Sequence, residues 1–131
     1  MEAGELNMID SRPSEGVARQ HSVEARAALD ELMQALDHCL DQLRDARHRA
    51  AELAEQHDSG QSWTAIVSAE TPPLIVERIS VAMSALSVSG SRWRRAQALV
   101  LHAEGVSINR IAALFRVTRQ RISALINGHA Q

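Results

Sequence analysis

The sequence predicts an all-α protein, and its length and composition support this fold class. The 131 residues fit one compact unit or two very small ones. The 45% apolar content is rich in Ala and Leu, which favour helices. Aromatic residues, which strands prefer, are limited to Trp63, Trp93 and Phe115. We expect a long N-terminal coiled-coil-like helix, a short helical module and a C-terminal three-helix domain.

Charge divides the chain into two opposed halves. Residues 1–90 hold 7 Arg and 15 acids, whereas residues 91–131 hold 7 Arg and one acid, Glu104. A basic segment of this kind indicates a nucleic-acid or membrane surface on its side. The sequence has no apolar run of about 18 residues and no secretory signal pattern. We therefore expect a cytoplasmic, nucleoid-associated protein with no membrane partner.

Catalytic and metal-binding patterns are not found. The single cysteine, Cys39, cannot form an internal disulfide or a cysteine-based zinc site. The 6 histidines lack the spacing of zinc ligands, and no nucleophilic triad or glycine-rich phosphate loop occurs. We expect no metal, no cofactor and no enzymatic activity.

Residues 1–20 mix Gly, Pro and Ser without a period and predict a flexible tail. Residues 21–57 predict a long helix in which apolar residues repeat in heptads. This pattern favours a homodimer, with the coiled-coil orientation open. The alternative is an amphipathic helix packed on its own domain. The predicted dimer interface consists of two seams, Leu29, Leu36, Leu43 and Ala50, and Leu32, Cys39, Ala46 and Leu53.

Residues 58–90 predict a second helical module. Gly60 ends the long helix, and Ser62 is placed to cap a short helix from Trp63 to about Ala69. Pro73 fits the first turn of a helix that runs to about Leu86. The small residues 87–91 predict a linker to the last domain.

Residues 91–131 predict three short helices, at 92–102, 107–115 and 118–127. Ser107 and Thr118 are suited to cap the second and third of these. Rigid packing of two such helices needs apolar residues at fixed points and a small residue where they cross. Ala112 is the small residue, and the apolar points are Ile111, Phe115, Val117, Ile122 and Leu125.

With these features, the segment 107–126 resembles a bacterial helix-turn-helix. Residues 92–127 look like the three-helix DNA-binding domains of resolvases, DNA invertases and transposase-associated regulators. The turn in these domains often carries Gly, where this chain has Arg116. A left-handed backbone at a non-glycine residue costs roughly 1–2 kcal/mol.

The resemblance implies double-stranded DNA as the partner and assigns roles to individual residues. Arginine pairs naturally with guanine and glutamine with adenine in the major groove. The residues expected to read bases are Arg119, Gln120, Ser123 and Asn127. Those expected to contact phosphates are Arg94, Arg95, Ser107, Arg110, Arg116, Thr118 and Arg121.

The central module repeats part of this pattern. The segment 60–66 aligns with 105–111, and its Gly-x-Ser-Trp-x-x-Ile element resembles helix-turn-helix starts of actinobacterial regulators. Duplication and chance similarity both explain the match. An acidic segment collects phosphates poorly, so we expect this degenerate module to be structural or partner-binding.

Three functions are compatible with the sequence. The leading one is a sequence-specific transcriptional regulator that acts as a homodimer and reads DNA with residues 118–127. The second is an interaction protein whose acidic N-terminal region binds RNA polymerase, a sigma factor or another regulator. The third is an accessory DNA-binding factor of a mobile element.

Overall fold

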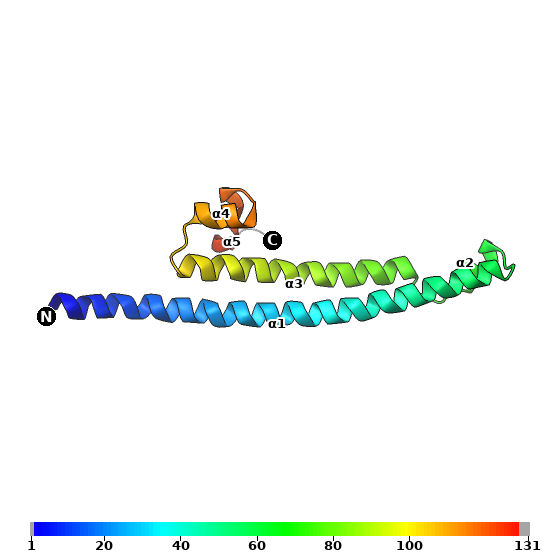
Figure 1. Ribbon diagram of the computed structural model, residues 1–131, viewed down its shortest axis with the longest axis horizontal. Helices are drawn as coiled ribbons and strands as arrows, with labels where there is room; N and C mark the ends of the chain where they lie inside the picture. The colour runs from blue at the N-terminus through cyan, green and yellow to red at the C-terminus, as the bar shows by residue number, and fades with distance from the viewer. Residues whose placement is uncertain (1, 129–131) are drawn as a thin grey trace. The chain divides into compact units, whose positions relative to one another are not determined.

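The computed structural model describes residues 2–128, with side chains from residue 15 onward. Met1 and residues 129–131, which belong to the predicted tail and C-terminal domain, lie outside the described residues. The chain is 85% helical, and the described residues contain no strand. The all-α prediction is therefore confirmed. The helices are α1 (Glu2–Asp58), α2 (Trp63–Ala69), α3 (Ile75–Ala103), α4 (Ile108–Phe115) and α5 (Arg119–Asn127) (Figure 1).

The chain divides into two compact units. The terminal unit joins Met1–Glu31 to Ser89–Gln131, and the central unit is Leu32–Val88. Both α1 and α3 contribute to each unit, because each helix passes through a unit boundary without a break. None of the described helices combines the length and the apolar character needed to cross a bilayer.

Helix α1 is longer than the sequence predicts at its N-terminal end. It begins at Glu2, so the segment predicted as an irregular tail is helical from that residue onward. Helix formers such as Glu, Ala, Met and Arg outnumber Gly, Ser and Pro in this segment, although Pro13 within it removes one helical hydrogen bond. The helix ends as predicted, close to Gly60, whose φ of 100° is left-handed.

Helix α2 has the predicted bounds and the predicted cap. The hydroxyl of Ser62 accepts a hydrogen bond from the backbone N–H of Ala65 at 3.2 Å. The cap satisfies one of the amides that a helix start leaves without a partner. One turn later Ile66 is only 1% exposed and anchors α2 in the core of the central unit.

Helix α3 corrects two predictions. Residues 87–91 are helical, so the expected linker does not exist. This segment contains no proline, and Ser and Gly each cost at most about 1 kcal/mol in a helix interior. Pro73 lies before the helix rather than in its first turn. The helix start is instead closed by the Glu77 carboxylate, which accepts a hydrogen bond from the N–H of Leu74 at 3.1 Å.

Candidate nucleic-acid interface

The C-terminal end of α3 packs with α4 and α5 in a three-helix domain (Figure 1). Ala98 of α3, Ile111 of α4 and Ile122 of α5 meet at its centre, and each is fully buried. Ala112, the predicted small residue at the crossing, is 6% exposed. The partly buried residues around this centre are Leu101, Val106, Ile108, Phe115, Val117 and Ile126. The predicted apolar points therefore form one core.

The turn between α4 and α5 is built around Arg116. This residue is left-handed, with φ 57° and ψ 44°, as the comparison with glycine-containing turns predicts. Its N–H donates to the Ala113 carbonyl at 3.3 Å, and the Val117 N–H donates to the Ala112 carbonyl at 3.0 Å. These two bonds close the end of α4 and set the direction in which the chain enters α5.

Both predicted caps are present. The Ser107 hydroxyl accepts from the Arg110 N–H at 3.2 Å, and the Thr118 hydroxyl accepts from the Arg121 N–H at 3.2 Å. Each cap satisfies one amide at its helix start and leaves other N–H groups of the first turn available. The N-terminus of α5 is thus able to interact favourably with a phosphate.

The four predicted base-reading residues share one face of α5. Arg119, Gln120 and Asn127 are exposed, and Ser123 is half-buried. At 100° per residue, this face lies roughly 140° around the helix from the buried pair Ile122 and Leu125. The helix therefore packs with one side and presents polar donors on the other.

The predicted phosphate-contacting residues divide into two groups. Arg110, Arg116 and Arg121 are exposed, and no ion pair between described residues involves them. Their charges are therefore available to an external anion. Ser107 and Thr118 are exposed as well, and they serve as helix caps.

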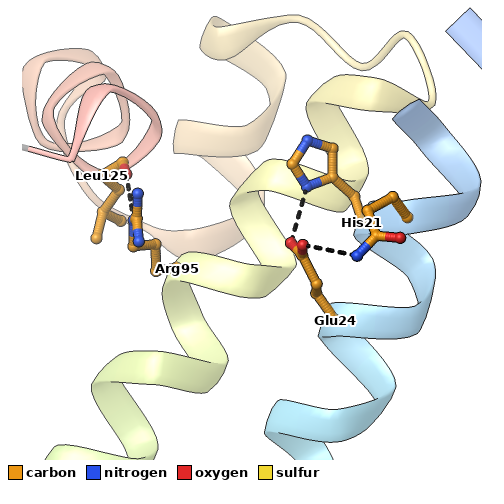
Figure 2. Close-up of polar contacts among 5 residues, drawn as sticks. His21, Glu24, Arg95 and Leu125 are labelled. Atoms are coloured by element: carbon orange, nitrogen blue, oxygen red, sulfur yellow. Dashed lines mark hydrogen bonds and ion pairs between the residues drawn. The ribbon is translucent and has the colours of Figure 1, made fainter. Parts of the chain in front are cut away.

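Arg94 and Arg95 are also exposed, and both make contacts inside the domain. The Arg94 guanidinium lies 5.4 Å from the centroid of the Phe115 ring, a cation–π distance. The Nε of Arg95 donates to the Leu125 carbonyl at 3.1 Å, which Figure 2 shows as a link between α3 and α5. Arg95 and Leu125 are 30 residues apart in sequence, so no local pattern could have revealed this contact.

The α1 part of the terminal unit carries its own polar contacts. The Glu24 carboxylate accepts from the Gln20 amide at 3.1 Å and lies 3.4 Å from Nδ1 of His21 (Figure 2). The Arg92 guanidinium, at the α3 side of this unit, lies 3.6 Å from the Glu31 carboxylate. Arg92 is thus the one residue of the basic segment found in an ion pair among the described residues.

The two predicted seams of the dimer interface differ in how far their residues are buried. Cys39 and Ala46 are buried within the central unit of a single chain, at 4% and 3% exposed. On the other seam, Leu36 and Leu43 are exposed. Of the remaining seam residues, Leu29, Leu32 and Leu53 are half-buried and Ala50 is exposed.

The central module repeats the local geometry of the start of α4. Gly60 and Gly105 both have positive φ, at 100° and 92°, and each is followed two residues later by a serine cap. The similarity ends after α2, because Glu70 is extended, with φ −69° and ψ 128°, where Arg116 is left-handed. The described part of this module therefore has no turn equivalent to the one that leads into α5.

Comparison with known families supports the three-helix domain. A family model described as a homeodomain-like domain matches residues 89–130. No curated protein and no solved structure matches the chain. The matched range contains the end of α3, the α4–α5 turn and the polar face of α5. The chain thus carries a homeodomain-like helix-turn-helix domain of the DNA-binding type.

Proposed function

We propose that this protein is a sequence-specific transcriptional regulator that acts as a homodimer and reads the major groove with α5. The observation that carries the proposal is the polar face of Arg119, Gln120, Ser123 and Asn127, held opposite a buried face. Base edges are read by side chains that a rigid helix presents in this way. The proposed role is binding, without catalysis.

The chemistry of the interface favours DNA over other anions. Arg119 is suited to a bidentate pair with guanine and Gln120 to one with adenine. Arg110, Arg116 and Arg121 supply charge for the phosphates on either side. A symmetric dimer of such domains would bind an inverted repeat whose half-site centres are about 10 bp, or a multiple, apart.

The test starts from a DNA site selected from a random pool with the full chain. Arg119→Ala and Gln120→Ala should each weaken binding to that site by about 5-fold or more, because each removes a bidentate contact worth about 1–3 kcal/mol. Arg26→Ala and Gln61→Ala are the matched controls, since both residues are exposed and lie outside the interface. Unchanged affinity in both α5 variants would refute the assigned reading helix.

A second candidate role is that of an interaction protein. The observation in its favour is the exposed apolar surface of the central unit, which includes Met33, Leu40, Val76 and Val81. In this role RNA polymerase, a sigma factor or another regulator binds the acidic N-terminal region. Affinity capture with the full chain carrying Arg119→Ala and Gln120→Ala discriminates the two roles, because a stable protein partner retained without DNA supports the second.

A further inference from the structure

In the central unit, part of the apolar surface of helix α1 is not covered by the rest of the unit. Cys39 and Ala46 face the interior. Four further apolar side chains, the α1 stripe, remain exposed on the same helix. They are Met33 at 45%, Leu36 at 41%, Leu40 at 50% and Leu43 at 37%. Large apolar side chains repeated at heptad spacing on an exposed helix face are typical of a helix that packs against a partner.

An open depression of about 430 Å³ adjoins the stripe and is formed by α1 alone. It is lined by Leu40, Leu43, Arg44, Arg47, His48 and Ala51. By contrast, a depression on the other flank of α1 is lined jointly by His38 and Gln42 of α1 and by residues of α3. The unit therefore packs α3 against one flank of α1 and leaves the stripe uncovered.

We propose that the α1 stripe binds the α1 stripe of a second copy of this chain in antiparallel orientation. The inference rests on the homodimer of the proposed function and gives it a surface and a direction. It also replaces the predicted seam of Cys39 and Ala46, which is occupied within the monomer.

The spacing of the stripe matches that of a second copy in antiparallel orientation. Its members are separated by three, four and three residues, a sequence of steps that is the same in both directions. A two-fold interface needs such a self-complementary surface. In the antiparallel pair, Met33 lies opposite Leu43 of the second copy, and Leu36 lies opposite Leu40. Each exposed side chain then gains an apolar partner.

Charge favours the antiparallel direction over the parallel one. Arg47 occupies the next heptad position after Leu43. A parallel pair in register places the two Arg47 guanidinium groups against each other in the seam, where desolvation strengthens their repulsion. The antiparallel pair places them at opposite ends. It brings the two Asp37 carboxylates to the edge of the seam, but Asp37 is exposed and water screens that repulsion.

Sedimentation of the full chain at micromolar concentration tests the surface. Wild type should be a dimer, and the double variant Leu36→Asp/Leu40→Asp should be a monomer with unchanged helicity by circular dichroism. The control is Val76→Asp/Val81→Asp, at two α3 side chains that are 73% and 71% exposed and lie outside the stripe. It should remain a dimer. A monomeric wild type, or a helical stripe variant that still dimerises, overturns the proposal.

Cross-linking tests the direction and does not depend on a disruptive substitution. In a Cys39→Ala background, Met33→Cys and Leu43→Cys chains are mixed and treated with a short bismaleimide. The mixture should give cross-linked dimers, whereas either variant alone should not, because equal positions lie about 15 Å apart along an antiparallel pair. Cross-linking of the Met33→Cys chain alone shows a parallel pair, and no cross-link in any sample shows that the two stripes do not meet. Either result overturns the proposal.

These outcomes are separable from failure of the proposed function. A cross-linked dimer that binds no DNA would support the α1 stripe and refute the regulator. A monomer that binds its selected DNA site, and loses it on Gln120→Ala, would refute the stripe and the homodimer but leave α5 as the reading helix.

Discussion

The guanidinium of Arg95 holds the C-terminal end of the helix that presents the polar face. Its Nε donates to the carbonyl oxygen of Leu125 at 3.1 Å. The Leu125 carbonyl lies in the last turn of α5, where it also accepts from the Gly128 N–H at 3.3 Å, and a positive charge there interacts favourably with the helix dipole. The contact joins α3 to α5 next to Gly128, where a Cβ would lie 3.3 Å from the same guanidinium. Arg95 is therefore placed to position α5, although the sequence suggests a phosphate contact.

Arg95→Ala should lower the free energy of unfolding by about 1.5–3 kcal/mol, the value of a hydrogen bond to a charged donor. It should also weaken DNA binding, because α5 loses a support. The dependence of affinity on salt should stay as in wild type, since no phosphate contact is removed. Thermal denaturation and binding titrations at several salt concentrations measure both effects. A reduced salt dependence with unchanged stability would instead show a phosphate contact.

Arg110→Ala should give the opposite result. The side chain is exposed and in no ion pair with a described residue, so its loss should leave the unfolding temperature unchanged. The slope of log affinity against log salt should fall by about one, as expected when one phosphate contact is lost. The same titrations serve for this variant, and Arg26→Ala, outside the domain, should keep the wild-type slope. If the slope of Arg110→Ala is also unchanged, Arg110 makes no phosphate contact.

Arg116→Gly should stabilise the domain by about 1 kcal/mol. The left-handed backbone at this position is strained for arginine and accessible to glycine. The same substitution at Arg110, inside α4, should destabilise by about 1 kcal/mol, because glycine is a poor helix former. Chemical denaturation of both variants provides the comparison. A loss of stability in Arg116→Gly would mean that the arginine side chain makes a contact that outweighs the backbone strain.

Thr118→Ala should destabilise α5 by about 1 kcal/mol, since the hydroxyl that accepts from the Arg121 N–H is lost. Thr118→Ser keeps an equivalent oxygen and should retain most of the stability. Thermal denaturation of both variants, with hydrogen exchange at the Arg121 amide, measures the difference. Equal stability of the two variants would show that the cap is not needed.

Local features of the fold were predictable from the sequence because short-range chemistry determines them. Ser62, Ser107 and Thr118 cap helices through bonds to residues three positions away, so a pattern of a few residues is sufficient. The left-handed turn at Arg116 follows from the place of glycine in similar turns. The amphipathic pattern of α4 and α5 identifies their common core.

Longer-range features were not predictable in the same way. Residues 87–91 are small and polar, yet they are helical because strong helical segments continue on both sides. Heptad spacing also identified which positions of α1 are apolar, but it did not identify the side chains against which they pack. Cys39 faces its own chain and Leu40, one residue later, is exposed. The contact between Arg95 and Leu125 depends on how α3 and α5 are packed.

The continuity of α3 has a consequence for dissecting the protein. The homeodomain-like match begins at residue 89, inside α3, where the preceding turn of the same helix supplies the carbonyl partners of the amides. In a fragment cut at this boundary, the first amides of the helix would lose these carbonyl partners, and Ser89 or Ser91 would have to cap the new helix start. The matched region therefore begins in the middle of a helix and not at a natural helix start. A fragment that begins further back, at the natural start of α3 near Leu74, would keep the closure that Glu77 provides.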